Sequence, residues 1–263
     1  MYSKEFLGQV FYQQGYNYRE LVPTGETKLG GGCQASSLLM GIRLMSGNTN
    51  LSMDLVAERA KELELVFFDR GFADRLSYVA IPLVAASLLP EHLVTTMHAK
   101  AQENIGDESA NVFGRETNKR YGNMHTTSNL VPIFSVNPYY QVRKMVSVVE
   151  KGGIAIPLVH PNTLFQNDNP DTQGFLHAVV LTNFDSATQT FSVIDANPGF
   201  SSIPNFSRRK EEGKIKIPSD RIHTLEMADR VASRFHPKKS VIYEVSASQL
   251  EKALRTVSTT ISA

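Results

Sequence analysis

The 263-residue sequence has no tryptophan and only one cysteine, Cys33. A single cysteine excludes an internal disulfide, so the fold does not depend on oxidation. The formal net charge of +1 gives no electrostatic basis for nucleic acid or an anionic membrane surface as the main partner. Long apolar runs are missing too, because the most apolar window, residues 78–89, is interrupted by Pro82 and too short to span a bilayer.

The histidines show no metal-ligand spacing with acids or with the cysteine, so we expect neither a metal nor another cofactor. The first residues, MYSKEF, do not place a basic segment before an apolar run, so no secretory signal is predicted and synthesis in a cytoplasm is expected. What is present suffices for a core, since hydrophobic residues make up 41% and charged residues 20% of the chain. We predict one domain over residues 1–263, with a helical subregion at about 33–151 and a sheet subregion at about 152–263.

Apolar periodicity places helices mainly in the first part of the chain and strands mainly in the second. Helices are predicted from Cys33 to about residue 46 and at 53–67, 72–88, 91–102, 139–151, 222–234 and 248–257, and strands at 154–159, 176–184, 190–195 and 240–245. Residues 1–32 are expected to form a loose lead-in, 104–138 a long loop and 258–263 a frayed end. This order predicts an α+β fold in which a helical half packs against an antiparallel sheet.

Cys33 follows three glycines and precedes a helical pattern. The glycines allow a tight turn, and the apolar residues after the cysteine have the spacing of a buried helix face. The thiol is therefore predicted at a helix N-terminus, where unpaired N–H groups and the helix dipole favour an anion such as a thiolate. A lone cysteine is usually a small buried side chain, so this stretch alone leaves a packing role and a reactive role open.

A predicted hairpin brings an imidazole and a carboxylate together. His177 begins its first strand and Asp195 ends its second, with a polar turn at 185–189 between them. The carboxylate can then bind one ring nitrogen and leave the other for a nucleophile, and Cys33 is the only thiol available. Taken singly, the histidine and the aspartate are as readily structural, but the three residues together predict a nucleophilic triad.

Cys33 at the head of a helix, His177 in LHAVVL and Asp195 in FSVIDANPG resemble, in this order, the papain-like cysteine peptidase superfamily. The similarity is greatest to its bacterial branches, the injected effector proteases and deamidases and the peptidase domains of bacteriocin exporters. The segment DANPG matches the Asp, Asn and Gly of a turn, Asp-Pro-Asn-aromatic-Gly, that is frequent in the effector branch. The resemblance implies a papain-like fold with the active site in the cleft between its two halves. It also implies export by a dedicated machine and action inside a host cell.

The oxyanion hole departs from the papain-like pattern. Those enzymes commonly place a glutamine about six residues before the cysteine, where this chain has Thr27. Thr27 itself, or Gln13, Gln14 or Asn17 folded back, could replace that donor; otherwise the backbone N–H groups of the cysteine and Gln34 must act unaided. Loss of one donor typically costs about 100-fold in rate, which counts against a standard protease and less against a slow deamidase or acyl-transfer enzyme.

Two alternatives to the predicted triad remain. Asn197 is a candidate third member, as asparagine is in papain itself, although Asp195 lies closer to the strand. His160 also stands at a strand end and competes with His177 as the base, but Pro161 follows it and no paired strand offers it a carboxylate.

The predicted function is a cysteine-dependent amide hydrolase that acts on protein or peptide substrates, foremost as a protease. Cys33 is the nucleophile, His177 the general base and acid, and Asp195 the orienting group, with a thioester intermediate that passes to water or an amine. One alternative is a glutamine deamidase or transglutaminase-type effector acting on a host protein. The other is a catalytically inactive papain-like binding module, which the missing glutamine favours.

Overall fold

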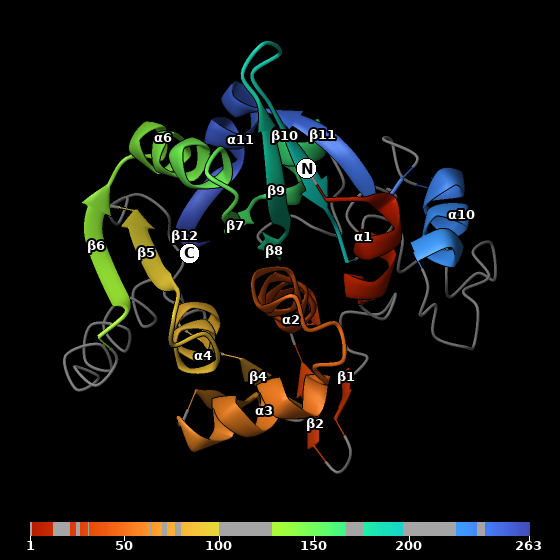
Figure 1. Cartoon of the computed structure of the whole chain (residues 1–263), viewed down its shortest axis with the longest axis vertical. Helices are drawn as coiled ribbons and strands as arrows, with labels where there is room; N and C mark the ends of the chain where they lie inside the picture. Colours follow the sequence, from red (N-terminus) through yellow and green to blue (C-terminus); the bar gives the residue numbers. More distant parts are fainter. Residues whose placement is uncertain are drawn as a thin grey trace.

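The computed structural model describes residues 2–12, 22–24, 27–30, 32–63, 65–69, 73–76, 80–99, 128–166, 176–196, 225–235 and 240–263. Within these residues the chain combines helices with one large mixed sheet and one small sheet (Figure 1). The α+β class predicted from the sequence is therefore confirmed.

The large sheet has eight strands in the described part of the chain, in the order β11-β10-β9-β7-β12-β5-β6, with β8 paired to β7. Its strands are β5 (Leu93–Ala99), β6 (Leu130–Val136), β7 (Ile154–Val159), β8 (His177–Ala178), β9 (Val180–Asp185), β10 (Thr190–Ile194), β11 (Ile242–Ser246) and β12 (Leu254–Ser262). The strands predicted at 154–159, 190–195 and 240–245 are present, and the one predicted at 176–184 is divided into β8 and β9.

One strand pair contradicts the expected antiparallel sheet. β6 runs parallel to β5, whereas the other pairs in the large sheet are antiparallel. A long segment separates Ala99 from Leu130, and parallel neighbours require such a connection so that the chain can return to the same end of the sheet. The sheet is therefore mixed.

Helices cover both faces of the large sheet. They are α1 (Lys4–Val10), α2 (Gly32–Ser46), α3 (Met53–Glu62), α4 (Ala80–Leu88), α6 (Pro138–Val149), α7 (Pro161–Phe165), α10 (Leu225–Phe235) and α11 (Ala247–Ala253). On one face α2 contacts β7, β8 and β9, α4 contacts β5, β6 and β12, and α3 packs against both helices. On the other face α6 contacts β7, β9 and β12, beside α11 (Figure 1). The helices thus sandwich the sheet instead of forming a separate half.

Strand β7 divides the core into two clusters by its period-two alternation. Ile154, Ile156 and Leu158 pack in the cluster on the α2 side, and Ala155 and Val159 pack in the cluster on the α6 side. Every residue of β7 is buried. A strand covered on both faces is expected to be apolar throughout, which explains the unbroken apolar run in its sequence.

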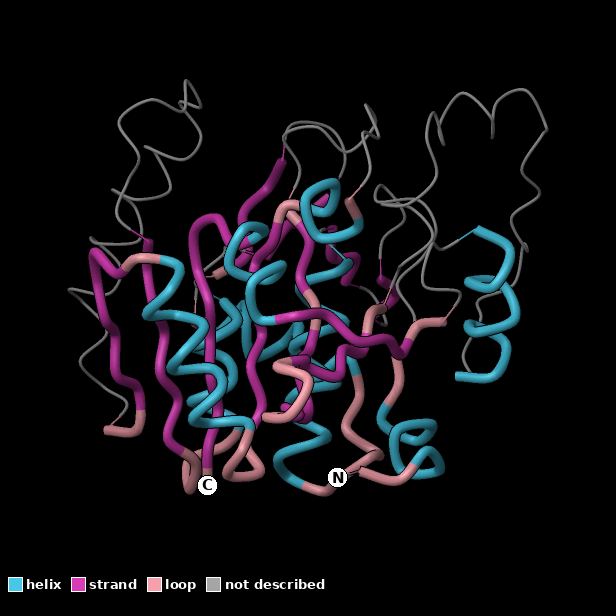
Figure 2. The backbone as a smooth tube through the Cα atoms, turned by 90° about the horizontal axis from the view of Figure 1, so that it is seen from above, coloured by secondary structure: helices cyan, strands magenta, loops and turns pink. Residues whose placement is uncertain are grey.

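The small sheet lies beside α3, and α10 lies on the opposite side of the molecule from β6 (Figures 1 and 2). The small sheet has the order β1-β2-β4-β3. Its strands are β1 (Val22–Thr24), β2 (Thr27–Gly30), β3 (Val66–Asp69) and β4 (Ala73–Leu76).

Several predicted helices are shorter than expected or are strands. Residues 66–67 and 73–76, assigned to helices from the sequence, lie in β3 and β4, and β5 occupies most of the predicted helix at 91–102. The sequence of β5, LVTTMHA, contains β-branched residues, which pack well on a pleated sheet. The expected loose lead-in contains helix α1, whose N-cap Ser3 accepts the N–H of Phe6.

Residues 258–262, expected to fray, and 254–257, expected to end a helix, instead form β12, an interior strand of the large sheet. β12 pairs with β7 on one side and β5 on the other, and Ser258, Thr259 and Thr260 are almost fully buried. In the sequence, these hydroxyl-bearing residues are typical of a solvent-exposed chain end. Inside the protein such a group can be satisfied, since Ser258 Oγ donates a hydrogen bond to Gln141 Oε1 on α6 at 2.6 Å.

Gly41 allows α2 to lie directly on β7. A Cβ atom at this position would come within 2.9 Å of the Cδ1 atoms of both Ile154 and Ile156, closer than carbon atoms normally approach. The missing side chain therefore sets the spacing between this helix and the sheet, and with it the place where α2 meets β8.

Gly41→Leu is expected to lower the free energy of unfolding by about 2 kcal/mol, because the new side chain must displace both isoleucines in a packed core. Gly8→Leu in α1 is the matched control, since a Cβ atom there meets nothing within 4 Å. That variant should be up to about 1 kcal/mol more stable through its higher helix propensity. Urea unfolding measures both values, and equal effects would contradict the close approach of α2 to β7.

Candidate active site

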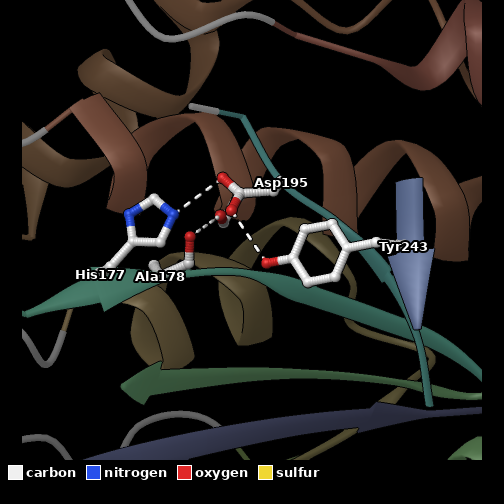
Figure 3. A network of polar contacts seen from close by, with 5 residues as sticks. His177, Ala178, Asp195 and Tyr243 are labelled. Atoms are coloured by element: carbon white, nitrogen blue, oxygen red, sulfur yellow. Dashed lines mark hydrogen bonds and ion pairs between the residues drawn. The ribbon is translucent and has the colours of Figure 1, made fainter. Parts of the chain in front are cut away.

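His177 and Asp195 meet at one edge of the predicted hairpin. His177 opens β8, and Asp195 directly follows β10. Nε2 of His177 lies 2.8 Å from Oδ1 of Asp195 (Figure 3). Asp195 is fully buried and His177 is 7% exposed, so little water competes for this contact. The juxtaposition predicted from the sequence is present.

The register of β9 and β10 produces this juxtaposition. The antiparallel pairing places Asp185 opposite Thr190 at the turn and Val180 opposite Ile194 at the other end. The residues just before β9 therefore lie beside those just after β10. A bulge in the pairing falls between these ends, and such irregularities increase the local twist of a strand.

Tyr243 belongs to the site although nothing in the sequence pointed to it. It lies on β11, where it pairs with Val193 of β10, and its hydroxyl donates a hydrogen bond to Oδ2 of Asp195 at 3.0 Å (Figure 3). A buried tyrosine hydroxyl usually has a hydrogen-bond partner. The identity of that partner depends on the pairing of two strands far apart in the chain, which a single sequence does not reveal.

Cys33 is the second residue of α2, which begins at Gly32, so the predicted position at a helix N-terminus is confirmed. Its side chain is partly buried. About one turn further along the helix, Ser37 Oγ donates a hydrogen bond to the carbonyl oxygen of Ala178 at 3.0 Å. Ser37 therefore fixes the beginning of α2 to the strand that carries His177.

Cys33 and Asp195 contact the same imidazole ring. Asp195 engages Nε2, and the second ring nitrogen, Nδ1, points away from that carboxylate (Figure 3). Burial lowers the pKa of His177, but the charge and hydrogen bond of Asp195, assisted by a hydrogen bond and charge from Cys33, raise this pKa to about 10. His177 is therefore expected to be protonated at neutral pH. A cationic imidazole beside a thiol is an arrangement in which cysteines react as thiolates.

The remaining candidates contribute less to this arrangement. Gln34 is buried, and its Oε1 has no hydrogen-bond partner within the described ranges. Thr27 lies in β2. His160, the competing base, is the N-cap of α7, and its Nδ1 accepts a main-chain N–H of that helix at 3.4 Å. The other predicted positions lie outside the described residues: Gln13, Gln14, Asn17 and Asn197.

No family model and no curated protein matches the chain significantly. The papain-like resemblance therefore stays a prediction, carried by the residues and their geometry. Across the parts of the chain that the structure describes, no helix has both the length and the apolar character needed to cross a bilayer. Over the same residues, no group of three or more histidine, cysteine or acidic side chains is arranged to hold a metal ion.

The raised pKa of His177 predicts a loss of stability at alkaline pH. A group whose pKa is higher in the folded protein stabilises it fully below the unfolded pKa of 6.5, and this contribution disappears as the pH rises toward about 10. In urea unfolding, the wild-type protein should lose more stability over this interval than His177→Gln, by an amount on the order of a few kcal/mol. Parallel losses in the two proteins would contradict a protonated His177.

Proposed function

We propose that the chain is a papain-like cysteine-dependent amide hydrolase that acts on protein or peptide substrates. Cys33 is the nucleophile, His177 the general base and acid, and Asp195 the orienting group. The observation that carries the proposal is the shared imidazole, which binds Asp195 at 2.8 Å through Nε2 and also interacts with Cys33. A nucleophile, a base and an orienting group linked in this way constitute a nucleophilic triad.

The reaction begins when the thiolate of Cys33 attacks the amide carbonyl carbon and the carbonyl π electrons move to oxygen. As the tetrahedral intermediate collapses, the C–N bond breaks and His177 gives its proton to the departing amine, leaving the acyl group on sulfur as a thioester. Neutral His177 then removes a proton from water while the water oxygen attacks the thioester. Cleavage of the C–S bond restores the thiolate and the imidazolium.

The oxyanion is bound by main-chain N–H groups of the first turn of α2. The first N–H groups of a helix have no acceptor within the helix, and those of Cys33 and Gln34 lie beside the attacking sulfur. Donors fixed before the reaction stabilise developing negative charge effectively. In this proposal these N–H groups take the role of the oxyanion-hole glutamine, whose usual position before the cysteine is occupied by Thr27 in this chain.

The same steps can act on a side-chain amide. Attack on a glutamine side chain would release ammonia and, with water, give glutamate, whereas transfer of the acyl group to an amine would give a cross-link. Proteolysis is the preferred activity, and these two reactions are its alternatives. An unreactive Cys33 would instead make the chain a binding module.

Cys33 is expected to react with iodoacetamide at about pH 6 at least tenfold faster than a free cysteine, because it reacts as a thiolate beside a cationic imidazole. His177→Ala should lower this rate to that of a free thiol. His92→Ala, a histidine outside the site, is the control and should leave it unchanged. Mass spectrometry of the alkylated peptide follows the reaction. Labelling no faster than a free thiol, and unaffected by His177→Ala, would reject the proposed enzyme.

Incubation of an unfolded test protein and glutamine-containing peptides with the chain separates the possible reactions. Proteolysis should yield fragments that are absent with Cys33→Ser, whereas deamidation leaves the chain intact and raises its mass by about 1 Da, as expected when an amide becomes an acid. Cross-linking to a primary amine would identify acyl transfer. Intact, unmodified substrates together with rapid labelling of Cys33 would argue against proteolysis of unfolded chains. That result would indicate a reactive enzyme with a narrower substrate specificity.

A further inference from the structure

Both oxygens of the Asp195 carboxylate are engaged, by side chains that approach from different strands. Oδ1 lies 2.8 Å from His177 Nε2 on β8, and Oδ2 accepts a hydrogen bond from the Tyr243 hydroxyl on β11 at 3.0 Å (Figure 3). The carboxylate has no solvent exposure. An ionised carboxylate in such a place needs partners that replace water.

Tyr243 is held independently of His177. Its main chain pairs with Val193 of β10, and its ring packs against Phe165, with the centroids 5.8 Å apart. The side chain is 6% exposed. Burial, followed by the charge and the hydrogen bond of Asp195, raises the pKa of the phenol well above 10. The hydroxyl therefore keeps its proton and acts as a donor over the whole range in which His177 titrates.

The backbone of Asp195 is fixed as well. Its main-chain N–H donates to the carbonyl oxygen of Val241 at 2.8 Å, and the Val241 N–H is itself bound by the carboxylate of Asp229 on α10 at 2.9 Å. With the main chain held, the Asp195 side chain can still rotate about its Cα–Cβ and Cβ–Cγ bonds. A donor on Oδ2 restricts that rotation, since turning the group would break the hydrogen bond from Tyr243.

We infer that Tyr243 is a positioning residue of the site, which directs Oδ1 of Asp195 at the His177 ring and keeps the carboxylate in its acceptor form. This inference rests on the proposed function, in which the Asp195–His177 pair supports the thiolate of Cys33. Tyr243 acts through Asp195 and does not itself touch the reacting atoms. The site then consists of four residues from α2, β8, β11 and the end of β10.

The inference has a pH signature. Among the described residues, the ionisable groups that face Asp195 include His177 from β8 and Tyr243 from β11, with Cys33 of α2 beyond the imidazole and Asp229 of α10 on the adjacent main chain. Without the Tyr243 hydroxyl, the ionised form of Asp195 loses a stabilising donor, so the carboxylate gains a proton at higher pH. A protonated Asp195 no longer supports the imidazolium, and Cys33 loses reactivity at that higher pH.

The test is the pH dependence of Cys33 alkylation by iodoacetamide, measured from about pH 4 to 9 for the wild type and Tyr243→Phe. The variant keeps the ring and its packing and removes only the O–H group. Its acid limb should move up by about one pH unit, so that the rate on the lower part of this limb falls up to about tenfold while the rate at the plateau changes less than about twofold. Asp195→Asn should lower the plateau itself.

Ser258→Ala is the control for the loss of a buried hydrogen bond. It removes the 2.6 Å contact with Gln141 on the α6 side of the sheet, and it should reduce stability without moving the acid limb. A wild-type Cys33 that is no more reactive than a free thiol would reject the proposed function. A reactive wild type whose acid limb is the same in Tyr243→Phe would reject only the role of Tyr243.

Replacement of Tyr243 by 3-fluorotyrosine provides a second variant should Tyr243→Phe fail to fold. The fluorinated phenol has nearly the same shape but is the stronger hydrogen-bond donor. It should stabilise the ionised carboxylate more and move the acid limb to lower pH. An acid limb at the wild-type position in this variant would also overturn the inference.

Discussion

A carboxylate without access to water is the constraint on which this structure depends. Asp195 is fully buried, and burial of a charge is tolerated only when hydrogen-bonded partners replace its hydration. His177 and Tyr243 provide them from β8 and β11, on either side of the chain that carries Asp195. A change of strand register would remove one of these partners and leave the charge exposed to an apolar core. The charge therefore helps to specify the register of the sheet that holds it.

The position of the thiol is determined by packing rather than by charge. Cys33 lies at the start of α2, and two contacts further along the helix fix its place. Ser37 hydrogen-bonds the main chain of β8, and Gly41 allows the helix to rest on β7. Because a helix is a stiff element, a change at Gly41 is transmitted over about two turns to the sulfur. The proposed chemistry thus depends on a residue with no side chain.

The sequence allowed the hairpin and the His177–Asp195 pair to be predicted because they lie in one stretch, with strand-like runs on both sides of a polar turn. Tyr243 could not be predicted, because the pairing of β10 with β11 produces no periodic pattern in the sequence. β12 was missed for another reason, because its hydroxyl groups look solvent-exposed until partners such as Gln141 are known. For β5, the local apolar spacing fits a helix and a strand equally, and only pairing with β12 and β6 decides between them.

The central place of β12 has a consequence for synthesis. β12 joins β7 to β5, and these two strands do not pair with each other. On the ribosome, the sheet therefore remains in two unconnected parts until residues 254–262 have left the exit tunnel. Such pairing of segments distant in the chain is slow to form, so the nascent protein would have to shield both open strand edges until its translation has passed this strand.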